Sequence, residues 1–131
     1  MIDYEVKIFN AVYPVAAPLC ANKKFISTQV KDTTALPAVG LWEMDNVTYR
    51  QRQSSTPIEN YSLITYQLEV YAKTKSECRK IFKAIDNRMI SMNFTRLSGR
   101  YIVYPDNLKV ARYVARYEVL VDQNGNLYRV S

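Results

Sequence analysis

The clearest hydrophobic pattern in the chain is an alternation of apolar and polar residues between Tyr61 and Tyr71. A two-residue period predicts a β-strand with one packed face and one solvated face. The apolar face carries Ile64, Tyr66, Leu68 and Val70, and the opposite face carries Thr65, Gln67, Glu69 and Tyr71.

The same alternation returns after Ala111 and predicts a second long strand. One face takes Tyr113, Ala115, Tyr117, Val119 and Val121, and the other takes Arg112, Val114, Arg116 and Glu118. Asn124-Gly125 is a hairpin signal, because both residues tolerate the positive φ angles of tight turns. We therefore expect Leu127 to Val130 to fold back as a short terminal strand.

A helix is predicted directly after the first long strand. Thr74 and Glu77 have the spacing of a capping box, in which each side chain satisfies a free backbone amide at the start of a helix. The apolar residues that follow recur at helical spacing: Cys78, Ile81, Phe82, Ile85 and Met89. This junction between strand and helix is the strongest local signal in the sequence.

Weaker patterns predict the remaining elements. Asp3 can cap a first helix with Val6, Ile8, Phe9, Val12 and Tyr13 on its apolar side, and Pro14 is expected to end or kink it. Short strands are expected at Phe25 to Val30, Ala38 to Met44 and Tyr101 to Tyr104.

This order of elements predicts an α+β fold. We expect one domain over residues 1–131, with an antiparallel sheet of four to five strands and two helices packed on one face. A long β-hairpin arm is expected between the second and third strands.

Composition adds little to this picture. The net charge is +6, but the lysines and arginines fall in short, scattered clusters, so solvated faces are the simplest interpretation. No apolar run approaches the roughly 18 residues of a membrane span. The opening residues are acidic and amphipathic, unlike a signal peptide, so we expect a soluble protein with no membrane contact.

The residues offer little chemistry. The chain has no histidine, which removes the commonest general base and metal ligand. Cys20 and Cys78 belong to no CxxC pair, and Cys78 is expected to be a buried, reduced thiol. The carboxylates form no motif-spaced pair, and there is no phosphate-binding glycine loop. The sequence therefore predicts a protein that is not an enzyme, with no catalytic residues, no cofactor and no metal.

The eleven tyrosines suggest an alternative function. Several lie beside an arginine, as in Arg112-Tyr113 and Arg116-Tyr117, and a sheet with interleaved aromatic and cationic residues could stack bases. A nucleic-acid-binding module is thus the second hypothesis. The simpler interpretation is favoured, since tyrosine suits half-buried strands and protein interfaces.

The segment from Asn46 to Asn60 is longer than the two to five residues of a tight hairpin. It is polar and carries Arg50 and Arg52. One interpretation is an arm that becomes ordered against a neighbouring protein. The other is a tolerated surface insertion, because doubling a loop costs only about 0.6 kcal/mol.

The order of parts resembles the tail-terminator, or tail-completion, proteins of long-tailed bacteriophages and related prophages. The resemblance runs from about residue 3 to residue 122. It rests on ALPAVGLWEM before the long loop, on ITYQLEVYAKTKSECRKIFKAID and on the Tyr/Arg-rich VARYVARYEVLVD. The most specific part is Leu63 to Asp86, where a strand runs directly into a capped helix. Another neck or tail-completion protein of the same fold group would show the same pattern.

The resemblance implies a subunit that self-associates into a ring, expected to be a hexamer, on the last ring of the tail tube. Such a ring stops tube growth and offers its other side to the head–tail connector protein. DNA would pass through the lumen without being read. The protein would belong to the virion tail and be assembled in the host bacterial cytoplasm. Our expected assembly interface consists of Tyr49, Arg50, Arg52, Gln53, Arg112 and Arg116.

Overall fold

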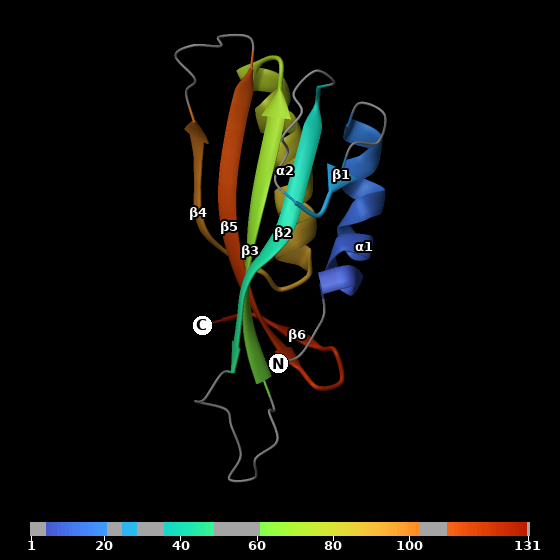
Figure 1. Ribbon diagram of the computed structural model, residues 1–131, viewed down its shortest axis with the longest axis vertical. Helices are drawn as coiled ribbons and strands as arrows, with labels where there is room; N and C mark the ends of the chain where they lie inside the picture. Colours follow the sequence, from blue (N-terminus) through green and yellow to red (C-terminus); the bar gives the residue numbers. More distant parts are fainter. Residues whose placement is uncertain (1–4, 21–24, 29–35, 49–60, 103–109, 131) are drawn as a thin grey trace.

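The structure, a computed structural model, describes residues 5–20, 25–28, 36–48, 61–102 and 110–130. Within these ranges, two α-helices and six strands confirm the predicted α+β class (Figure 1). In chain order they are α1 (Glu5–Ala16), a 3-10 turn η1 (Ala17–Leu19), β1 (Phe25–Ile26), β2 (Ala38–Thr48), β3 (Tyr61–Ala72), α2 (Lys75–Ser91), β4 (Thr95–Ile102), β5 (Ala111–Asp122) and β6 (Leu127–Tyr128).

The strands form one sheet in the order β1-β2-β3-β5-β4, and β6 pairs with the end of β5. The central pair is antiparallel and runs without interruption from Tyr61 opposite Asp122 to Ala72 opposite Ala111. The sheet differs from the prediction in having six strands and one parallel pairing, of β1 with β2. Phe25 stacks on Phe9 with ring centroids 4.5 Å apart, so aromatic packing holds β1 against the first helix.

Both helices lie on the same face of the sheet, as predicted (Figure 1). The predicted apolar stripe of α2 is buried throughout. It packs with Ile8, Val12 and Ala16 of α1 and with the apolar sides of β3 and β5. Arg88 joins the helices, because its Nε donates a hydrogen bond of 3.0 Å to the carbonyl of Ala11. The main core therefore lies between the helices and the centre of the sheet.

The opposite side of the sheet, called the open face below, is only partly solvated. A second small apolar cluster forms there around Ala38 and Tyr71, with Ile26, Leu36 and Val110 packed against it. Glu69 is also buried on this face, with 1% of its surface exposed. The prediction of a wholly solvated face on β3 was therefore wrong, because β1 and the residues beside β5 cover part of it.

Two predictions about helix ends had different outcomes. Thr74 caps α2 as predicted, since the amide of Glu77 donates to the Thr74 hydroxyl at 3.1 Å. The reciprocal half of the predicted capping box is not formed by Oε1 of Glu77, which is buried without a hydrogen-bond partner among the described residues. Pro14 does not end α1, which continues to Ala16 with the proline inside its last turn. Proline removes one helical hydrogen bond. The burial of Val12 and Ala16 on the core side of that turn outweighs this loss.

Two strands are longer than predicted. β4 begins at Thr95 instead of Tyr101, and its register shifts between Arg96 and Ser98. A bulge of this kind places an extra residue in one strand, so the side chains lose their simple alternation. β2 continues to Thr48, past the predicted end at Met44, after a similar shift between Glu43 and Asp45.

Strands β2 and β3 extend past the ends of both helices (Figure 1). Residues 45–48 and 62–65, called the distal hairpin below, pair with each other in this region. The first three residues of the predicted loop, Asn46 to Thr48, therefore belong to a strand. The rest of that loop lies outside the described residues.

Candidate functional site

The predicted interface residues fall into two groups. Tyr49, Arg50, Arg52 and Gln53 lie outside the residues that the structure describes. Arg112 and Arg116 lie on β5 and face the open side of the sheet, as the alternation predicted. They stand opposite Tyr71 and Gln67 of β3, respectively.

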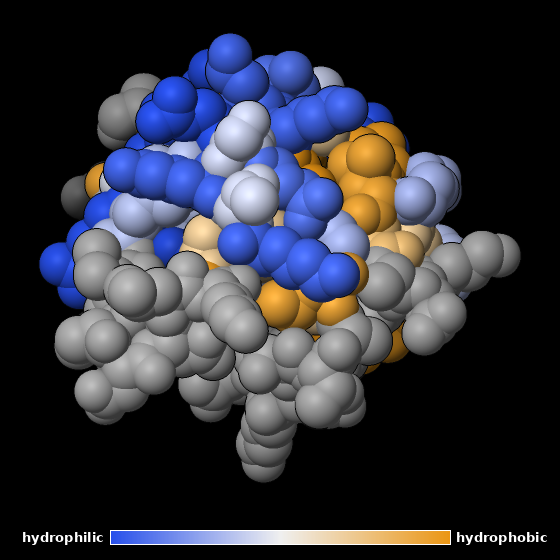
Figure 2. All heavy atoms as spheres, turned by 90° about the horizontal axis from the view of Figure 1, so that it is seen from above, coloured by the Kyte–Doolittle hydropathy of each residue, from blue (hydrophilic) through white to orange (hydrophobic). Residues whose placement is uncertain are grey.

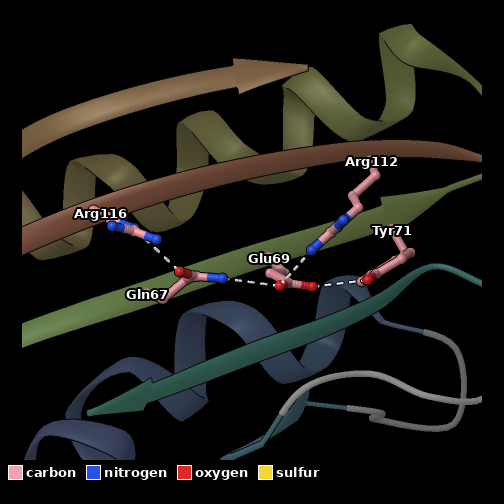
Figure 3. Close-up of polar contacts among 5 residues, drawn as sticks. All are labelled: Gln67, Glu69, Tyr71, Arg112 and Arg116. Carbon is pink, nitrogen blue, oxygen red and sulfur yellow. Dashed lines mark hydrogen bonds and ion pairs between the residues drawn. The ribbon is translucent and has the colours of Figure 1, made fainter. Parts of the chain in front are cut away.

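Glu69 connects these residues into one polar row across β3 and β5 (Figure 3). Its carboxylate accepts hydrogen bonds from the Tyr71 hydroxyl at 2.7 Å and from Nε2 of Gln67 at 2.9 Å. Arg112 completes the group with an ion pair of 2.6 Å. A buried carboxylate is costly unless it is paired and hydrogen-bonded, and here both conditions are met.

Arg112 is held inside this row. Its side chain is 16% exposed, and its guanidinium lies 5.5 Å from the centroid of the Tyr71 ring. An arginine that pairs with a buried carboxylate and packs on an aromatic ring stabilises its own subunit. Arg112 is thus placed to support the sheet and offers little surface to a partner.

Arg116 is exposed, in contrast. Its Nε donates a 3.2 Å hydrogen bond to Oε1 of Gln67. Beside it is a surface hollow of about 340 Å³ between β4 and β5, lined by Ser98, Gly99, Arg100, Val114 and Arg116. The sequence prediction did not include Arg100, because the bulge hid the start of β4. The one sequence feature that could have indicated Arg100 as a site residue was its position directly before Tyr101.

The tyrosines and arginines of β5 lie on opposite faces of the sheet. Tyr117 is buried on the helix side and donates a 2.6 Å hydrogen bond to Asp86. Tyr113 packs on Phe82 of α2, with ring centroids 4.1 Å apart. These rings do not share a surface with Arg112 and Arg116, so β5 provides no combined face of arginine and stacking tyrosine.

Both cysteine thiols and the Tyr117 hydroxyl are buried. Burial raises the pKa of Cys78 to about 12 and that of Cys20 to about 11, so both thiols are protonated at neutral pH. Burial, together with the hydrogen bond to Asp86, also raises the pKa of Tyr117. Within the described parts of the chain, no three Cys, Asp or Glu residues gather as a metal site.

The distal hairpin exposes apolar side chains. Met44, at the bulge where this region begins, and Val47 each have 44% of their surface exposed. Val47 is opposite Leu63 of β3. A contiguous exposed apolar patch can mark a surface that another protein covers. Val6 of α1 and Leu97 of β4 are also exposed. The sequence pattern had placed Val47 in a loop, whereas Met44 and Leu63 were predicted in strands.

Comparison with models of known protein families finds no match to this chain. Comparison with curated proteins also finds none. Neither helix in the described ranges has the length and apolar character needed to cross a membrane.

Proposed function

We propose that the protein is a bacteriophage tail-terminator subunit, which forms a ring on the end of the tail tube and joins it to the head. The proposal rests on the resemblance of residues 3–122 to that family. It agrees with the α+β fold and with a strand–helix junction at the predicted residues. The proposed partners are further copies of the chain, the tail tube protein and the head–tail connector.

The observation that supports an assembly role most directly is the distal hairpin. It extends past both helices (Figure 1). It carries Val47, and Met44 directly precedes it at the bulge; both side chains are exposed in the isolated subunit. Burying apolar surface contributes roughly 25 cal/mol per Å², so covering these residues would favour association. The hairpin also leads into the segment with Arg50 and Arg52, which we proposed from the sequence as an arm.

In this proposal the protein acts by shape and has no catalytic step. The ring would cap the tube, block addition of further tube subunits and present its other side to the connector. DNA would pass through the lumen. The site of action would be the virion tail, after assembly in the bacterial cytoplasm. The nucleic-acid alternative loses its main support, because the tyrosines of β5 pack against the helices.

The test is the mass of the purified protein across a range of concentrations, alone and with purified tail tubes. We expect a ring with the wild-type chain and monomers with Met44→Glu combined with Val47→Glu. Val6→Glu is the control, since Val6 is 70% exposed and lies on α1, outside the hairpin. A wild-type protein that stays monomeric in both conditions would refute the proposal. Rings that survive the hairpin change would exclude the hairpin as the contact.

A further inference from the structure

β4 is the outer strand on one side of the sheet. It pairs with β5 from Thr95 opposite Glu118 to Ile102 opposite Arg112. Among the residues that the structure describes, no strand pairs with its other edge. Such an edge presents backbone N–H and C=O groups that can pair with a strand from another chain.

Two arginines flank the open-face side of this edge. Arg100 stands opposite Val114, and Arg116 stands opposite Ser98, so the arginines are diagonal neighbours on one face. They border the hollow of about 340 Å³ described above. The hydrogen bond to Gln67 fixes Arg116, and neither arginine forms an ion pair within the described ranges. The hollow therefore carries two positive charges that form no ion pair with a described carboxylate.

Cations also flank β4 on the helix side. Nε of Arg79 donates a 3.0 Å hydrogen bond to the Tyr101 hydroxyl, and the Lys75 ammonium lies 4.8 Å from the centroid of the same ring. Tyr101 thus holds two α2 cations beside the strand. Figure 2, which looks down on the end where α2 begins, shows hydrophilic residues over a broad part of the coloured surface.

Most of the exposed charged residues in the described ranges are basic. The exposed acidic residue in these ranges is Asp45, on the distal hairpin. Two acids lie close to β4: Glu118 of β5 stands opposite Thr95, and Asp86 of α2 accepts hydrogen bonds from Arg96 and Tyr117. The exposed cations are Lys7, Lys73, Lys75, Arg79, Lys80, Lys83, Arg96, Arg100, Arg116 and Arg129. This excess of cations around the edge favours an acidic partner.

A polypeptide fits this edge better than a nucleic acid. Bases bind to exposed aromatic rings, but Tyr101 and Tyr113 pack edge to face with centroids 4.7 Å apart on the helix side. In contrast, an added strand would use the backbone groups of β4. Its alternate side chains would lie on the open face, beside Ser98 and Arg100.

We propose that the β4 edge binds an extended acidic segment of a partner protein by strand addition. Alternate carboxylates of that segment enter the hollow between Arg100 and Arg116, where guanidinium groups bind carboxylates with charge-assisted hydrogen bonds. This surface is separate from the distal hairpin, and the proposal does not depend on the tail function.

The test uses a fluorescent peptide about as long as β4, with alternating Glu and Thr, and measures its anisotropy against the folded protein. We expect saturable binding that weakens as salt rises. Arg100→Gln with Arg116→Gln should weaken binding about tenfold or more. The matched control is Lys80→Gln with Lys83→Gln, which removes the same charge from exposed α2 residues and should leave binding nearly unchanged.

Two further probes separate strand addition from simple charge attraction. The same peptide with N-methylated alternate amides keeps its charge but cannot pair with an edge, so its binding should be lost. An oligothymidine of equal charge should bind more weakly than the acidic peptide. Three outcomes would each overturn the proposal. The two double variants could lose peptide affinity equally, the methylated peptide could bind fully, or the oligothymidine could bind more tightly than the acidic peptide. The absence of peptide binding would also overturn the proposal. The basic side chains and the bulge of β4 would then serve only to prevent edge-to-edge aggregation.

Discussion

The Arg112 guanidinium lies 2.6 Å from the carboxylate of Glu69, and the two residues come from neighbouring strands of the open face (Figure 3). Glu69 is 1% exposed, so its charge depends on this partner and on the hydrogen bonds from Gln67 and Tyr71. The pair joins β3 to β5 at a point where the sequence pattern predicted solvent. The ion pair between Arg112 and Glu69 therefore helps to hold β3 and β5 together on the open face.

Removing Arg112 should therefore destabilise the fold. Arg112→Met keeps most of the apolar stem but leaves a buried carboxylate without its cation, which costs about 3–5 kcal/mol. Chemical denaturation will measure the loss. Adding Glu69→Gln should recover part of it, because no buried charge then remains. Arg116→Met is the control and should change stability by less than about 0.5 kcal/mol. Equal effects of Arg112→Met and Arg116→Met would mean that the ion pair contributes nothing.

The apolar stripe of α2 should carry much of the stability. Ile81 and Phe82 are 3% and 6% exposed and pack against the sheet. Ile81→Ala or Phe82→Ala should cost about 2–5 kcal/mol, because each change leaves a cavity. Lys83→Ala, on the exposed side of the same helix, is the control. Unchanged denaturation midpoints in both core variants would contradict the packing described here.

These elements were predictable from the sequence because their signals are local. The alternation in β3 and β5 and the spacing of Thr74 and Glu77 each extend over only a few residues. In these segments the local sequence preference and the burial of side chains favour the same secondary structure. Glu69 was placed in solvent, because its burial depends on β1 and on Val110, which are distant in the chain. The parallel pairing of β1 with β2 was not predicted for the same reason, because it joins segments that are separate in the chain. The start of β4 was missed because the bulge after Arg96 disrupts the side-chain period.

Gly99 is opposite Ala115 of β5 and lies against the side chain of its diagonal neighbour Tyr113. A Cβ at this position would lie 2.6 Å from the Tyr113 hydroxyl oxygen, in a region where Tyr113 also packs on Phe82 and Tyr101. Gly99→Ala should therefore force the ring to move and cost about 1–3 kcal/mol. Ser98→Ala, one residue earlier and exposed, should be nearly neutral. Thermal unfolding of both variants will decide, and an equally stable Gly99→Ala would show that the ring relocates freely.

Alkaline pH should destabilise the fold through Cys78. Burial raises its pKa from 9.0 to about 12, so above pH 9 the unfolded chain loses this proton before the folded chain does. The contribution of the protonated Cys78 thiol to the free energy of unfolding is fully present below pH 9. It falls as pH rises toward 12, by at most about 1.4 kcal/mol per pH unit. Denaturation at several pH values will show the slope. Cys78→Ala should have a shallower slope above pH 9, whatever its stability at neutral pH. Identical slopes would contradict the burial of the thiol.

The last prediction concerns Arg50 and Arg52, which follow β2 shortly after its end at Thr48. Two arginines spaced by one residue project to the same side of an extended chain. Against an acidic patch of a neighbouring subunit or the tube protein, each can form bidentate, charge-assisted contacts. Truncating charged pairs that become buried at an interface costs about 2–5 kcal/mol, so Arg50→Ala with Arg52→Ala should impair assembly strongly.

Folding should change by no more than about 0.5 kcal/mol in the same double variant, because no predicted core position is altered. The measurements are the melting temperature of the free protein and tail joining in a phage complementation assay. Lys80→Ala with Lys83→Ala removes equal charge from α2 and should support normal plaque formation. A loss of infectivity in the arginine variant with an unchanged melting temperature would locate the assembly contact in this segment. Normal plaques from that variant would mean that the segment is an insertion without a role in tail joining.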